Sequence, residues 1–118
     1  LDELQQDNPR IEISQTDEPS VALANASAVY TDVWSSMGFE SEQEARQKDF
    51  ADYQVNSKMM SLAPSDAVFM HCLPAHRGEE VTNDVIDGPQ SVIVKQAANR
   101  MHLQKGLLLW LVRKAEAA

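Results

Sequence analysis

Residues 67–78 read AVFMHCLPAHRG, and this stretch decides the expected fold. Its apolar start, residues 67–70, is typical of a strand that is buried on both faces of a parallel sheet. Reactive side chains follow at once, including the only cysteine, Cys72, and the histidines His71 and His76. In open parallel sheets, ligands bind beyond the carboxyl ends of the strands. The stretch therefore predicts a strand of an α/β protein that ends at a ligand site.

Helical and β-rich patterns alternate along the rest of the chain. Residues 11–14 alternate apolar and polar side chains, as a half-buried strand does. Further strands are expected over 28–31, 67–70 and 91–94, and helices over 1–6, 18–26, 40–53, 57–63 and 97–114. This order is typical of an α/β fold, in which a mainly parallel sheet is flanked by helices and the chain ends in a long C-terminal helix.

Composition and charge limit the class of function. The 118 residues suffice for one domain, and the net charge of −8 is concentrated in residues 1–54, which carry −9. An acidic chain is a poor candidate for nucleic-acid binding, and the longest apolar run, 107–112, is too short to span a bilayer. The acidic start has no apolar signal region, and a single cysteine cannot form an internal disulfide. We therefore expect a cytoplasmic protein without a nucleic-acid or membrane partner.

Three side chains are expected at the carboxyl-terminal edge of the sheet. Asp32 ends the second strand, Cys72 ends the third, and Arg100 lies beyond the fourth, in the first turn of the last helix. A carboxylate there can hold an ammonium group, and a thiol can lie beside a reacting atom. An arginine at a helix N-terminus favours a phosphate or a carboxylate. Together these groups suit a ligand pair of one amine and one phosphate.

The same residues also have purely structural interpretations. Cys72 could be a small buried hydrophobe, Asp32 could cap a turn, and Arg100 could pair with a surface acid. His71, Cys72 and His76 resemble part of a zinc pattern, but no second Cys/His pair accompanies them. No metal or cofactor is therefore expected. The sequence has no Gly-x-Ser-x-Gly elbow, so it gives no support to a serine hydrolase.

Three motifs resemble the ornithine carbamoyltransferase family. They are DVWSSMG at residues 32–38, HCLP at 71–74 and NRMHLQK at 99–105, and their order and spacing agree with that family over essentially the whole chain. The resemblance implies a Rossmann-like ornithine-binding domain. Aspartate carbamoyltransferases are similar in fold but carry a different residue at the position of Cys72.

The resemblance also implies a role for each motif residue. Asp32 would bind the amino groups of ornithine, while Ser36 and Met37 would contact its amino-acid end. Cys72 would lie beside the δ-amino group, and Cys72 and Leu73 would also contact carbamoyl phosphate. Arg100 would hold carbamoyl phosphate and stabilise charge as phosphate leaves.

The implied reaction gives citrulline and phosphate from L-ornithine and carbamoyl phosphate, in arginine metabolism. It implies no cofactor, and a homotrimer or higher oligomer for the complete enzyme. Residues 1–118 would form part of the ornithine-binding domain only, because the Ser-x-Arg-Thr and His-Pro motifs of the amino-terminal, carbamoyl phosphate-binding domain do not occur. The chain also opens within a helical pattern and without methionine. We therefore expect a fragment that is inactive alone.

Two alternatives stay open. The chain could be a stand-alone amino-acid-binding or interaction module, or part of a carbamoyltransferase for another amine. One departure from the family is local: the residues before Asn99 are usually acidic, whereas here they are Gln96, Ala97 and Ala98. This change removes the basis for expecting salt bridges around Arg100.

Overall fold

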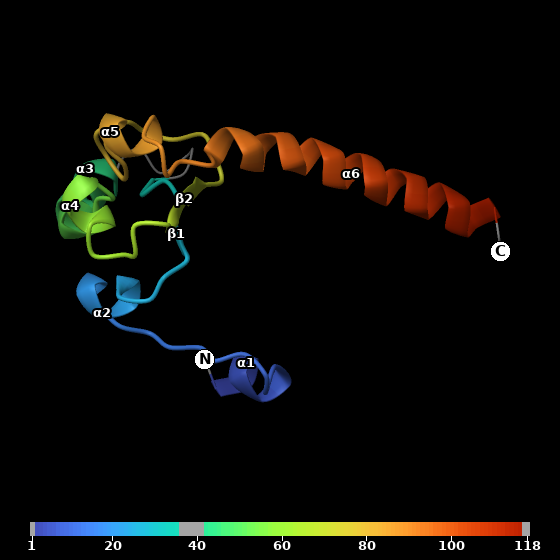
Figure 1. The fold of residues 1–118 in the computed structure, drawn as a ribbon, viewed down its shortest axis with the longest axis horizontal. Coiled ribbons are helices and arrows are strands. Elements are labelled where there is room, and N and C mark those ends of the chain that lie inside the picture. Colours follow the sequence, from blue (N-terminus) through green and yellow to red (C-terminus); the bar gives the residue numbers. More distant parts are fainter. Residues whose placement is uncertain (1, 36–41, 117–118) are drawn as a thin grey trace.

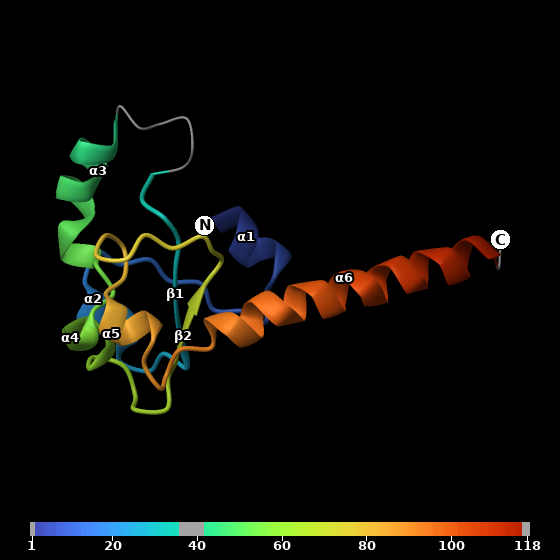
Figure 2. The same cartoon turned by 90° about the horizontal axis from the view of Figure 1, so that it is seen from above.

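Two parallel strands form the sheet in the computed structural model, which describes residues 2–35 and 42–116. Strand β1 (Ala28–Thr31) pairs with β2 (Val68–His71) in a register that sets Val29 opposite Phe69 and Thr31 opposite His71. Figures 1 and 2 show the two strands side by side, with short helices gathered on one side of them, the first helix set apart near the N-terminus, and the last helix leaving this body. The predicted α/β class is confirmed.

The expected outer strands are wrong. Residues 11–14 form no strand, because no neighbouring strand offers backbone partners; the N–H of Ile13 instead donates to the side-chain Oε1 of Gln5. In the expected strand 91–94, only Ser91 makes a parallel bridge, with Phe69. The N–H of Val92 donates to the carbonyl of Phe69 at 3.0 Å, and the next residues are already helical.

Short helices precede, connect and follow the two strands. They are α1 (Asp2–Asp7), α2 (Pro19–Leu23), α3 (Gln43–Phe50) with the 3-10 turn η2 (Ala51–Tyr53), α4 (Ser57–Met60) and α5 (Asn83–Ile86). Asn56 caps α4 as its sequence predicts, since its Oδ1 accepts the N–H of Met59 at 2.9 Å. Helix α5 is not among the helices that the sequence predicts.

The core lies between the two strands and helices α2, α4 and α5. Phe69 is completely buried and belongs to a cluster of eight buried apolar residues: Leu23, Val29, Val55, Met60, Phe69, Val81, Val85 and Ile86. The cluster draws on segments from residue 23 to residue 86, so it holds the two strands, α4 and α5 in one body. The carboxyl ends of both strands are thereby fixed relative to each other.

Helix α6 (Ile93–Glu116) begins against β2 and then extends away from the body (Figure 1). The six apolar residues 107–112 on it are all exposed. Within residues 2–35 and 42–116, no helix is both long and apolar enough to cross a bilayer. A long helix that exposes a continuous apolar run is unusual for a monomer on its own and points to a covering surface.

Candidate functional site

Asp32 and Cys72 meet at the carboxyl ends of the two strands. Asp32 follows β1 directly and Cys72 follows β2 directly, so the pairing of Thr31 with His71 makes them neighbours. The thiol of Cys72 donates to Oδ1 of Asp32 across 2.9 Å, and the N–H of Val33 donates to the same oxygen across 2.7 Å. The structure thus brings together two of the three residues that sequence topology places at this edge.

Hydrogen bonding and charge shift the acidity of both groups. The bond from the Cys72 thiol, followed by the bond from the Val33 N–H, lowers the pKa of Asp32 below its ordinary value. The bond to Asp32 raises the pKa of Cys72, and burial and the negative charge of Asp32 raise it further. At neutral pH the pair is therefore a carboxylate beside a neutral thiol, which suits contact with an amine rather than nucleophilic attack.

The pH dependence of Cys72 alkylation tests this pair. Only the thiolate reacts with iodoacetamide. We therefore expect the rate of Cys72 alkylation to rise with pH, with its inflection at a higher pH than for an ordinary thiol. Asp32→Asn keeps an acceptor but removes the charge, so it lowers the pKa of Cys72 and speeds alkylation at pH 8. Asp49→Asn, at an exposed position of α3, is the control. A lower inflection in the unmodified chain than in Asp32→Asn would contradict the arrangement.

A buried pair, His71 and Glu80, supports the turn after Cys72. Nδ1 of His71 accepts the N–H of Leu73 at 2.8 Å, so the proton of the neutral ring lies on Nε2, which donates to Oε1 of Glu80 at 3.1 Å. Both side chains are fully buried. Leu73 has a φ of +61°, a conformation that costs a branched residue energy and that this bond holds in place. The pair therefore fixes the backbone at residues 72 and 73.

Sequence reasoning missed Glu80 and Gln96 as parts of this support. Oε1 of Gln96, on α6, accepts the N–H of His71 at 3.0 Å. A neutral amide thus joins β2 to α6 at this point. No sequence pattern could identify these contacts, because Glu80 lies 9 residues and Gln96 lies 25 residues from His71 along the chain.

The loop after Asp32 is fastened to α3. Nη1 of Arg46 donates to the carbonyl of Trp34 at 3.3 Å, and its Nη2 is paired with Glu42 at 3.0 Å. The ring of Trp34 packs on Phe50 with 6.2 Å between centroids. Ser36 and Met37, the expected contacts of the amino-acid end of ornithine, lie outside the described residues.

The expected placement of Arg100 at a helix N-terminus is wrong. Helix α6 begins at Ile93, so Arg100 lies seven residues past its start, beyond the free N–H groups of the first turn. Arg100 is exposed and lines a hollow of about 480 Å³ with Met70, Val92, Lys95, Gln96, Asn99 and Leu103. Asp32 and Cys72 do not line this hollow.

Comparison with known families decides the relationship. The sequence model of the Asp/Orn binding domain of aspartate/ornithine carbamoyltransferases matches residues 1–111. The chain belongs to this family. An ornithine carbamoyltransferase from Azoarcus sp. is 61% identical over 99 residues, which cover 84% of this chain and 32% of that protein. One from Methanobrevibacter smithii is 62% identical over 97 residues, covering 82% of this chain and 32% of that protein.

A solved member of the family confirms the Rossmann-like fold. The ornithine carbamoyltransferase from Pyrococcus furiosus matches with a TM-score of 0.71 and 57% identity, over 76% of this chain and 29% of its own. The chain thus spans about a third of the length of the carbamoyltransferases that it matches.

Proposed function

We propose that this chain supplies the ornithine-binding part of an ornithine carbamoyltransferase. The reaction would transfer the carbamoyl group of carbamoyl phosphate to the δ-amino group of L-ornithine and release L-citrulline and phosphate, in cytoplasmic arginine metabolism. The observation that carries the proposal is the 2.9 Å contact between Cys72 and Asp32, where two parallel strands end. The family and its similarity to ornithine carbamoyltransferases support the choice of substrate.

The pair at the strand ends suits an amine that must change its charge. Free alkylamines have a pKa of about 10.4 and arrive as ammonium, which the Asp32 carboxylate attracts. Attack on the carbamoyl carbon needs the neutral amine, so the ornithine ammonium group loses one proton to solvent before it attacks, and the second proton of that nitrogen leaves with the departing phosphate. The Cys72 thiol is neutral and can orient the amine without competing as a nucleophile. Collapse of the intermediate breaks the C–O bond to phosphate.

The remaining roles concern the position of the two substrates. Ser36 and Met37 would contact the amino-acid end of ornithine, and the backbone of Cys72 and Leu73 would face carbamoyl phosphate. Arg100 would bind carbamoyl phosphate through its exposed guanidinium. His71 and Glu80 act through the backbone at Leu73 and are positioning residues. Asp32 and Cys72 contact the reacting amine and are the catalytic residues of this half, with Arg100 at the leaving group.

The domain and its partners follow from the same proposal. Residues 1–118 form part of an ornithine-binding domain, and an amino-terminal domain would bring most of the carbamoyl phosphate ligands. The complete enzyme would be a homotrimer or a higher oligomer. The exposed apolar run 107–112 of α6 favours this over a stand-alone binding module, which would bury such a run or lack it.

A chimera tests the proposal. Residues 1–118 would replace the corresponding segment of the Pyrococcus furiosus enzyme, to which the matched part is 57% identical. We expect the purified chimera to form citrulline from ornithine and carbamoyl phosphate, while the chain alone forms none. The parent enzyme is the positive control. Citrulline formation by the chain alone, or a folded chimera that binds carbamoyl phosphate but makes no citrulline, would contradict the proposal.

A further inference from the structure

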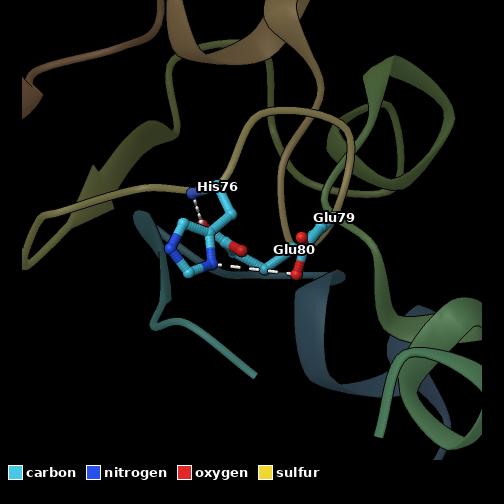
Figure 3. A group of neighbouring side chains, drawn as sticks. All are labelled: His76, Glu79 and Glu80. Carbon is cyan, nitrogen blue, oxygen red and sulfur yellow. Dashed lines mark hydrogen bonds and ion pairs between the residues drawn. The ribbon is translucent and has the colours of Figure 1, made fainter. Parts of the chain in front are cut away.

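A second group of polar side chains lies in the loop between β2 and α5. His76, Glu79 and Glu80 each offer one potential ligand atom, and these atoms lie within 4.8 Å of one another (Figure 3). The three residues follow one another as His76-x-x-Glu79-Glu80, so one turn of chain supplies all of them. The side chain of Glu80 is fully buried, and that of Glu79 is mostly buried.

Each residue has a buried atom in this group that makes no hydrogen bond: Nδ1 of His76, Oε2 of Glu79 and Oε2 of Glu80. Nδ1 of His76 and Oε2 of Glu79 are 3.7 Å apart, which is within ion-pair range but too long for a hydrogen bond (Figure 3). Oε2 of Glu80, on a fully buried side chain, has neither kind of partner. Buried polar atoms without a hydrogen bond are rare in folded proteins, and three in one place call for a ligand.

The other carboxylate oxygens are already held. Oε1 of Glu80 accepts from Nε2 of His71 at 3.1 Å and from the N–H of His76 at 2.6 Å. Oε1 of Glu79 accepts from Nε2 of Gln43, on α3, at 3.2 Å. Such outer contacts orient ligand side chains in metal sites and leave the second oxygen of each carboxylate free. Here they leave one oxygen of each of two adjacent carboxylates without a hydrogen bond, in a group that also includes the imidazole of His76.

We propose that His76, Glu79 and Glu80 bind a divalent transition-metal ion of the Zn²⁺ type. One imidazole nitrogen and two carboxylate oxygens form a donor set that such ions accept, and the positive charge offsets two neighbouring carboxylates, one of them buried. The part of His76 that is exposed, 43% of its side chain, leaves a route for the ion and room for water as a further ligand.

Binding requires a small movement. Ligand atoms at about 2.0–2.2 Å from a zinc ion lie no more than about 4.4 Å apart, so the present span of 4.8 Å must contract. Rotation of the exposed His76 side chain provides it. The ion would join the loop to Glu80, and through His71 to the backbone of Leu73. The ion would stiffen the backbone support beneath the proposed site. Its binding does not require the reaction proposed there.

The sequence predicts no metal site, because that prediction rests only on the spacing of cysteine and histidine residues. His71 and Cys72 take no part in the donor set. The nearest histidine to them, His76, instead combines with carboxylates three and four residues further along the chain. A pattern of one histidine and two acids in a loop is too common to predict a metal from sequence.

Titration of the full chain with Co²⁺, without a histidine tag, tests the proposal. We expect one equivalent to bind, with visible absorption typical of nitrogen and oxygen ligands. His76→Ala and Glu79→Gln should each weaken binding by about tenfold or more. His102→Ala, an exposed histidine of α6, is the matched control and should bind as the unchanged chain does. Circular dichroism verifies that each variant keeps the fold.

Cys72→Ser separates this site from the thiol. A thiolate ligand to Co²⁺ gives a charge-transfer band in the near ultraviolet, which the proposed site does not predict, and Cys72→Ser should leave the affinity unchanged. Loss of binding in Cys72→Ser, equal binding by His76→Ala and the unchanged chain, or no binding of Co²⁺ by the folded chain would each overturn the proposal. Because the readout is spectroscopic, these outcomes do not depend on transferase activity.

Discussion

Asp32→Asn is expected to lower citrulline formation by the chimera about 10²–10³-fold, as does the loss of one preorganised electrostatic group in other enzymes. The asparagine side chain still accepts hydrogen bonds from the Cys72 thiol and the Val33 N–H, so the fold at the strand ends is kept. What is lost is the negative charge that attracts the ornithine ammonium group. Initial rates measured over a range of ornithine concentrations report this change.

Asp49→Asn in the same chimera is the matched control. Asp49 is an exposed acid of α3, so its loss changes the net charge equally without touching the strand ends. We expect its kinetics to equal those of the chimera. A reduction of less than about threefold in Asp32→Asn, or an equal reduction in both variants, would show that Asp32 has no special place in ornithine binding.

Phe69→Ala is expected to lower the free energy of unfolding of the chain by about 3–5 kcal/mol, the usual result of truncating a buried aromatic side chain. Phe69 is fully buried and pairs in register with Val29 of β1, while its N–H donates to the carbonyl of Gln90 and its carbonyl accepts the N–H of Val92. A domain is typically stable by about 5–15 kcal/mol. Urea denaturation followed by circular dichroism measures the loss.

Phe50→Ala serves as the comparison for Phe69→Ala. Phe50 keeps 39% of its surface exposed and meets Trp34 at the end of α3, so its removal deletes the same atoms from a half-open position. We expect a loss below about 1.5 kcal/mol, in proportion to the smaller area buried. Equal losses in the two variants would contradict the placement of the core around β2.

The central strands and the meeting of Asp32 with Cys72 could be predicted from sequence. Continuous apolar runs indicate buried strands. Parallel strands bring their carboxyl ends to one edge of the sheet, regardless of the conformation of the connecting loops. Strand β1 lies where the pattern predicts it, and β2 is displaced by one residue. The topology of the sheet, rather than any detail of side-chain packing, carried this part of the prediction.

The failures have physical causes at particular residues. Residues 11–14 have the apolar–polar alternation of a strand. A strand also needs a neighbouring strand to pair with, and the alternation does not indicate whether one is present. Residues 92–94 are apolar and β-branched, yet Ile93 and Val94 begin a helix because the chain turns after its single bridge to Phe69. Glu80 was missed because a buried carboxylate depends on partners, here His71, that only the folded chain brings together.

Protection of Cys72 by ornithine tests the central claim most directly. In the chimera, alkylation of Cys72 can be followed by mass spectrometry of its peptide, with carbamoyl phosphate left out so that no reaction occurs. If ornithine binds between Asp32 and Cys72, saturating ornithine slows alkylation of Cys72 about tenfold or more, as expected for a thiol covered by its ligand. The same concentration leaves the Asp32→Asn variant unprotected. An alkylation rate that ornithine does not change in the active chimera would contradict the account.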